Sequence, residues 1–190
     1  TFTTEIGTLP YICPKYYTLL IRGNRKRRKF LQFINTMRRV VITGLGALTP
    51  IGNNLESYWT NLKAGKSGAA EITQFDPTHF RTKFACEVKD YDPLAHFNRK
   101  EARKLDKFCQ YALIATDEAI QDSQILSDAL DHNRVGVIWS SGIGGLNVFQ
   151  EEIENFASNN GVPRFNPFFI PKMIANMASG HISIKYGFRG

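Results

Sequence analysis

The sequence carries thiols and imidazoles, but their spacing assembles no reactive pair. Three cysteines, Cys13, Cys86 and Cys109, lie far apart and form no CxxC pair, which disfavours both a structural zinc and a disulfide framework. Four histidines are scattered along the chain: His79, His96, His132 and His181. None has a second metal ligand at helical spacing. From the residues alone, we expect no nucleophile–base pair and no metal site in residues 37–190.

Two glycine-containing loops look like nucleotide-binding motifs. Gly44-Leu-Gly46 follows an apolar run and precedes a helix pattern, but the third glycine of a dinucleotide fingerprint is replaced by Thr49. A turn-forming loop is therefore favoured, and a nucleotide-binding domain remains a minor alternative. Gly65-Lys66-Ser67 resembles the end of a phosphate loop, but the first glycine of that motif is replaced by Thr60. We therefore expect no cofactor.

Two apolar segments could line a pocket. In the segment 140–145, Ile143 stands between glycines, as in a strand-to-helix turn or a movable apolar stop. The segment 166–171 places three large apolar residues between two prolines: Phe168, Phe169 and Ile170. Core packing and a rigid pocket wall explain this second segment equally well.

The net charge of +7 is concentrated at the start of the chain. Residues 1–36 hold seven Lys or Arg and one acid, so the remainder is nearly neutral. A basic arm that binds nucleic acid or an anionic membrane is one interpretation. Because Met37 directly precedes a strand pattern, we instead expect residues 1–36 to be upstream read-through, and we expect no nucleic-acid partner. The sequence has no run of 18 apolar residues, so it predicts no membrane-spanning helix. The cysteine pattern favours a cytoplasmic location.

A basic stripe is the strongest charge feature of the remaining chain. Its members recur at i, i+3, i+4 and i+7 of a helix pattern: Lys100, Arg103, Lys104 and Lys107. Such a stripe is usually a solvated helix face. On a nearly neutral body, however, it also favours an acidic partner.

Strands and helices are expected to alternate from Met37 onward. We predict strands over 38–43, 83–88 and 135–139. We predict helices from Asn53 or Asn54 to Lys63, over 99–122, over 146–157 and from Pro171 onward. The helix over 99–122 should bury one apolar face, which includes Cys109 and Ala112. This alternation predicts an α/β class with a largely buried sheet.

Five segments together resemble the amino-terminal half of a β-ketoacyl-acyl carrier protein synthase, an elongating ketosynthase. They read RRVVITGLGALTPIGN, WTNLKAGKSG, RKEARKLDKFCQYAL, SSGIGGL and NPFFIPKMIANMASGHISIKYGFRG. They occur from Met37 to Gly190 in the order and spacing of the family. The resemblance implies two parts: a leader at 1–36 outside the family, and an amino-terminal ketosynthase domain at 37–190 that stops before the nucleophile.

The resemblance implies a thiolase-like layered α/β/α/β/α fold, of which this chain would hold the first half. It also implies decarboxylative Claisen condensation of acyl groups with malonyl-carrier protein in fatty acid synthesis. The family performs this reaction with one cysteine and two histidines, and no cysteine or histidine here matches them. We therefore expect the chain by itself to be inactive, and the whole enzyme to be a homodimer that uses an acyl carrier protein.

The resemblance also assigns roles by position. Ile143 matches the gate of the acyl pocket, and Phe169 and Ile170 match residues that line it. Four bases match positions that contact the carrier protein: Lys100, Arg103, Lys104 and Arg164. Phe165 occupies a position that is often basic in the family. A non-catalytic partner subunit that sets chain length remains an alternative.

Overall fold

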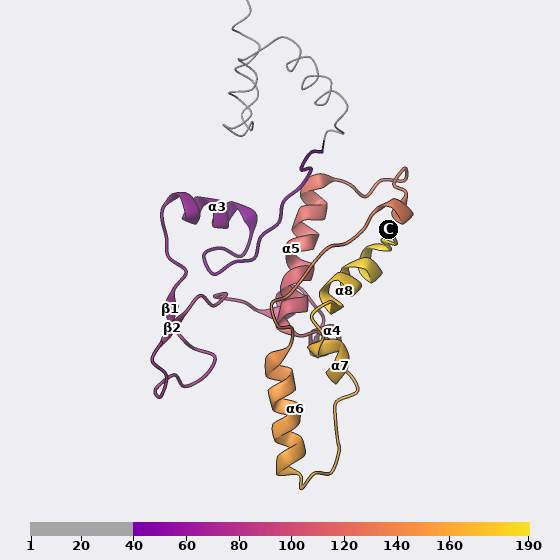
Figure 1. Cartoon of the computed structure of the whole chain (residues 1–190). Coiled ribbons are helices and arrows are strands. Elements are labelled where there is room, and N and C mark those ends of the chain that lie inside the picture. Colours follow the sequence, from indigo (N-terminus) through magenta and orange to yellow (C-terminus); the bar gives the residue numbers. More distant parts are fainter. Residues whose placement is uncertain (1–39) are drawn as a thin grey trace, which may run out of the picture. The chain divides into compact units, whose positions relative to one another are not determined.

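A computed structural model describes residues 40–190 (Figure 1). The leader at 1–36, Cys13 and the first two residues of the expected strand at 38–43 lie outside the described residues. The unit Ile42–Gly190 contains every helix and strand named below. In chain order these are α3 (Leu55–Lys63), β1 (Ala70–Glu71), β2 (Phe84–Ala85), α4 (Arg99–Lys104), α5 (Lys107–Ser123), α6 (Leu146–Ser158), α7 (Phe169–Met173) and α8 (Met177–Tyr186). Short 3-10 helices cover Pro93–Ala95 and His132–Arg134.

The core lies between α5 and α8, which run side by side (Figure 1). Cys109, Ala112 and Leu113 of α5 pack there with two residues of α8, Ala178 and Ile182. All five side chains are buried. The predicted apolar face of α5 is therefore confirmed at Cys109 and Ala112, and its small residues let the two helices approach closely.

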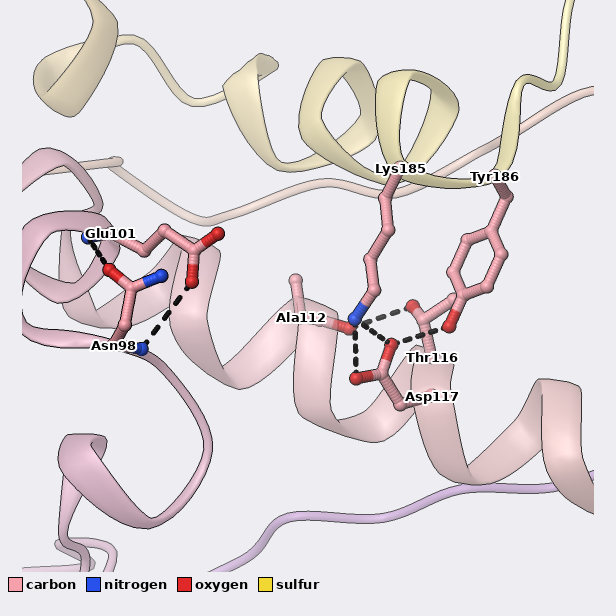
Figure 2. A network of polar contacts seen from close by, with 7 residues as sticks. All are labelled: Asn98, Glu101, Ala112, Thr116, Asp117, Lys185 and Tyr186. Carbon is pink, nitrogen blue, oxygen red and sulfur yellow. Dashed lines mark hydrogen bonds and ion pairs between the residues drawn. The ribbon is translucent and has the colours of Figure 1, made fainter.

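A polar cluster ties the same two helices together beside the core (Figure 2). Lys185 Nζ lies 2.6 Å from both carboxylate oxygens of Asp117. The Tyr186 hydroxyl donates a hydrogen bond to the same carboxylate. The pKa of Tyr186 is raised above its usual value. Burial is the larger cause, and the hydrogen bond and negative charge of Asp117 are the smaller ones. Asp117 therefore fixes the end of α8 against the middle of α5.

The helix predicted over 99–122 is two helices, and the single-helix prediction is wrong. Asn98 caps α4. Its Oδ1 accepts hydrogen bonds from the amides of Lys100 and Glu101 at 3.0 and 2.9 Å. In return, the Glu101 carboxylate accepts a hydrogen bond from the Asn98 amide, and Figure 2 shows this reciprocal pair. The backbone then extends at Leu105, and Asp106 caps α5 by accepting the Phe108 amide at 3.2 Å. The carboxylate of Asp106 satisfies an amide that a continuous helix would have bonded internally.

The predicted buried strands are also wrong. The described part of the first, 40–43, forms no strand, and Val40 and Ile42 are 90% and 83% exposed. The segment 135–139 is likewise irregular, with Ile138 fully exposed. The sheet seen within residues 40–190 is a two-stranded antiparallel pair, β1 with β2, and β2 covers only part of the strand predicted over 83–88. Apolar β-branched runs become strands only where a neighbouring strand supplies hydrogen-bond partners.

The helices predicted from Asn53 or Asn54 to Lys63 and over 146–157 are confirmed with adjusted ends, whereas the single helix predicted from Pro171 onward is wrong. Asn54 caps α3, and Gly65 follows it with φ of 67°, a left-handed conformation that suits glycine. Helix α6 lies where a helix was predicted. Pro171 does not open its helix but occupies the third position of α7, where its missing amide has no internal partner anyway. An extended Ile174 then separates α7 from α8.

None of the helices between residues 40 and 190 combines the length and the apolar composition that crossing a bilayer requires.

Candidate acyl pocket and carrier-docking surface

The loop after Thr43 packs its backbone directly on α5. A Cβ atom on Gly46 would lie 1.9 Å from the carbonyl oxygen of Ala115, and one on Gly44 would lie 2.3 Å from that of Ala119. Only glycine permits this approach. These glycines therefore serve contact between loop and helix.

Two carboxylates of α5 accept hydrogen bonds from backbone amides of this loop and of the helix that follows it. Asp122 accepts the Leu45 amide at 2.9 Å. Glu118 accepts the Ala47 amide at 2.8 Å with one oxygen and the Leu55 amide, at the start of α3, at 2.8 Å with the other. A nucleotide phosphate would need such amides to be free and would face two negative charges. These contacts disfavour the minor alternative of a dinucleotide site at this loop.

The basic residues of α4 differ in their surroundings. Lys100 and Arg103 are exposed to solvent. Lys104 is half-buried, and its Nζ lies 5.2 Å from the centre of the Phe168 ring, at the start of α7. This contact brings the candidate docking helix next to the segment that carries Phe169 and Ile170.

Arg164 lies on the loop between α6 and α7 and is exposed. It lines a hollow of about 660 Å³ together with Glu152 and Asn166, whose amide donates to the Glu152 carboxylate at 3.1 Å. Arg164 therefore lies next to the end of α6 and on the loop that leads to α7. Within residues 40–190, no hydrogen bond or ion pair joins the Arg164 side chain to the bases of α4.

The candidate pocket residue Phe169 belongs to an aromatic stack. Its ring stacks on Phe165 at 5.7 Å between centroids and on Phe149 of α6 at 6.2 Å, and Phe165 stacks on Phe156 at 5.6 Å. Offset stacking of this kind holds α7 against α6. Phe169 is half-buried by these rings, whereas Ile170 beside it is 50% exposed.

The loop that carries Ile143 is fastened to the other end of α7. The Gly145 amide donates to the Met173 carbonyl at 3.0 Å, and Gly144 adopts a φ of 83°. The Ile143 side chain itself is 71% exposed. The structure thus brings the Ile143 loop and Phe169 to opposite ends of one short helix, without enclosing a chamber around Ile143.

The two described cysteines differ in their surroundings. Burial, with a smaller effect of the nearby Asp106 charge, raises the pKa of Cys109 to about 12. Cys86 is exposed. A packed thiol is the expectation for both residues: it is confirmed at Cys109, which lies in the core, and it is wrong at Cys86.

The comparisons with known proteins assign the family. Residues 37–190 match the family described as beta-ketoacyl synthase, N-terminal domain. The chain belongs to this family. It is 44% identical over 153 residues to the 3-oxoacyl-[acyl-carrier-protein] synthase 2 of Synechocystis sp., covering 80% of this chain and 36% of the relative. The same-named protein of Vibrio harveyi is also 44% identical over 153 residues, with 80% and 37% covered.

Solved ketosynthase structures share the fold. A type II polyketide ketosynthase in complex with its acyl carrier protein aligns with a TM-score of 0.64 at 26% identity, covering 80% of this chain and 41% of that one. The beta-ketoacyl synthase chain thus has part of the thiolase-like fold, as the resemblance implied. It spans little more than a third of the length of the curated relatives it matches.

Sequence reasoning missed two parts of this site. The first is the pair of carboxylates on α5, Glu118 and Asp122. Their i, i+4 spacing, which places both on one face of the helix, was the signal available in the sequence. The second is the aromatic stack. Its signal in the sequence was the spacing of its members, since Phe149 and Phe156 lie two helical turns apart and Phe165 and Phe169 lie four residues apart. The contact of Lys104 with Phe168 has no local sequence signal, because 64 positions separate the two residues.

Proposed function

We propose that this chain forms the amino-terminal portion of a 3-oxoacyl-[acyl-carrier-protein] synthase that elongates fatty acyl chains. The observation that carries the proposal is the 44% identity to synthases of this name, together with the family match over 37–190. Within this proposal, residues 37–190 are the ketosynthase part and 1–36 lie outside it. A cytoplasmic location and a homodimer complete the proposal.

The reaction proposed for the whole protein has two steps. An acyl group passes from the carrier thioester to a cysteine thiolate, and the carrier thiol leaves. Malonyl-carrier protein then loses carbon dioxide, and the resulting carbanion attacks the enzyme thioester. A carbon–carbon bond forms, the carbon–sulfur bond breaks, and the cysteine thiolate is released. In this proposal the chain supplies walls and a docking surface for that reaction, and neither Cys86 nor Cys109 serves as the nucleophile.

Two surfaces support the assignment of roles. Lys100, Arg103 and Lys104 offer positive charge on α4, which suits an acidic carrier protein. We assign Arg164, which is exposed on the loop between α6 and α7, to the same docking role. Phe169, Ile170 and Ile143 lie on or beside α7, and we assign them to the acyl pocket and its gate.

The test uses the protein expressed from its complete reading frame. It is incubated with an acyl-carrier protein and malonyl-carrier protein, and the carrier-bound products are weighed by mass spectrometry. A 3-oxoacyl product two carbons longer than the starting acyl group supports the proposal. A protein that elongates nothing by itself, but shifts product length when mixed with an active ketosynthase, would instead be the chain-length-setting subunit.

A further inference from the structure

One contact joins the candidate docking helix to the candidate pocket wall. Lys104 stands in the last turn of α4, and its Nζ lies 5.2 Å from the centre of the Phe168 ring. An ammonium at this distance from a ring is attracted by the negative face of the π system. Lys100, on the same helix, is exposed and has no ring contact of this kind among the described residues.

Phe168 sets the start of α7. It is the N-cap residue of that helix, its amide donates to Asn166 Oδ1 at 2.9 Å, and its carbonyl accepts the Lys172 amide at 2.9 Å. The next residue, Phe169, is the one held in the aromatic stack. The residue that carries the ring is thus part of the first turn of α7.

The far end of α7 is hydrogen-bonded to the loop that carries Ile143, the candidate gate. The Met173 carbonyl accepts the Gly145 amide at 3.0 Å, and a Cβ on Gly144 would lie only 2.2 Å from the same oxygen. The loop cannot shift independently of α7 without losing this bond. The path from Lys104 to Ile143 thus consists of one cation–ring contact, one short helix and one backbone hydrogen bond.

We propose that Phe168 is a positioning residue and that Lys104 has two alternative partners, the Phe168 ring and a carboxylate of the docked carrier protein. This inference rests on the proposed function. A partly exposed cation–ring contact and a rim ion pair have similar strengths, so the exchange is nearly balanced. Docking would then release the start of α7, and the acyl chain in the pocket would affect carrier affinity in return, because coupling between binding sites is reciprocal.

The experiment compares five variants of the protein from its complete reading frame: Lys104→Met, Lys100→Met, Phe168→Leu, Phe168→Tyr and the double variant Lys104→Met/Phe168→Leu. Methionine keeps the apolar stem and removes the charge. Leucine keeps an apolar side chain and removes the ring. For each, kcat and KM are measured with carriers loaded with a short and a long acyl chain, and the Kd of the unloaded carrier is measured by calorimetry.

We expect Lys100→Met to weaken use of both carriers equally. We expect Lys104→Met to change the ratio of long-chain to short-chain kcat/KM by about threefold, the size expected for loss of one such contact. In the Phe168→Leu background, Lys104→Met should no longer change that ratio. Phe168→Tyr, which keeps a ring, should behave as the wild type.

Equal effects of Lys104→Met and Lys100→Met on both carriers would overturn the inference, as would the same Lys104→Met effect with and without the Phe168 ring. If the wild-type protein condenses nothing, the proposed function fails. The carrier Kd values then still decide the inference, since a dual role predicts that Phe168→Leu tightens carrier binding only when Lys104 is present. Circular dichroism of each variant identifies any that fail to fold, and if Phe168→Leu is among them, the comparison of Lys104→Met with Lys100→Met on the two carriers still decides the inference.

Discussion

Burial decides the reactivity of the Cys109 thiol. With its pKa raised to about 12, almost none of it is thiolate near neutral pH, and the side chain is fully buried. We predict that iodoacetamide at pH 7.5 alkylates Cys86, which is exposed, well before Cys109. Peptide mapping by mass spectrometry measures the two rates. Faster labelling of Cys109 would show that α5 and α8 do not stay packed.

His181 gives the fold a pH dependence whose sign is fixed by its burial. Its Nε2 has no hydrogen-bond partner among the described residues, and burial lowers its pKa from the ordinary value of 6.5. Because the folded state disfavours the charged ring, stability is complete above the ordinary pKa and is lost as the pH falls through and below it.

We therefore predict that a His181→Asn variant loses less stability between pH 7.5 and pH 5 than the wild type does. Urea unfolding at both pH values measures the difference. His79→Asn, at an exposed position, is the control and should leave the wild-type pH dependence in place. A variant whose curves keep the full wild-type dependence would remove His181 from this role.

At the scale of elements, Glu118 joins α5 to α3 and to the loop before it. It accepts the amides of Ala47 and Leu55, both in partly buried surroundings. Glu118→Ala should therefore lower the free energy of unfolding by about 2 kcal/mol, since two amides lose their acceptor. Gln121→Ala, at an exposed site on the same helix, should change it little. Denaturant unfolding of the two variants measures both, and equal stability would contradict the role of Glu118.

Elements whose ends are marked by local cap and turn residues could be predicted from the sequence, whereas elements that depend on distant residues could not. Asn54 and Gly65 define the ends of α3 within the local sequence, so this helix follows from spacing alone. Asp106 breaks the expected long helix because its carboxylate caps a new one, and a single aspartate in an apolar pattern is a weak signal. The segments 40–43 and 135–139 have strand composition, but pairing depends on residues far away in the chain.

The candidate site shows the same division. The glycines before α6 and the apolar residues around Pro171 were visible as unusual patterns, and the family resemblance attached roles to Ile143, Phe169 and Ile170. The contact of Lys104 with Phe168 and the packing of α7 on α6 could not be predicted, because they depend on how separate helices are placed.

For the whole molecule, exposed apolar segments are the dominant surface feature of the described unit. Ile42 is 83% exposed, Ile138 is fully exposed and Ile184 on α8 is 78% exposed. Surfaces of this kind usually meet another surface, and extended apolar segments with free backbone groups favour pairing with other chains.

We predict that residues 37–190 expressed alone self-associate and bind a hydrophobic dye, and that Ile138→Lys reduces both. Light scattering and dye fluorescence measure the effect. Lys89→Glu, a charge change at an exposed polar site, is the matched control and should alter neither. A monomeric chain that binds no dye would mean that these segments fold back on the unit itself.

Two adjacent residues of α5 hold the unit together from different directions. Asp117 binds the end of α8, and Glu118 binds the loop and helix that come first in the unit. Inserting or deleting one residue earlier in α5 would rotate both carboxylates by about 100° and detach both neighbours at once. This turn should therefore accept point changes singly but resist any change in length, and variation in the number of residues among related chains should fall in the surrounding loops.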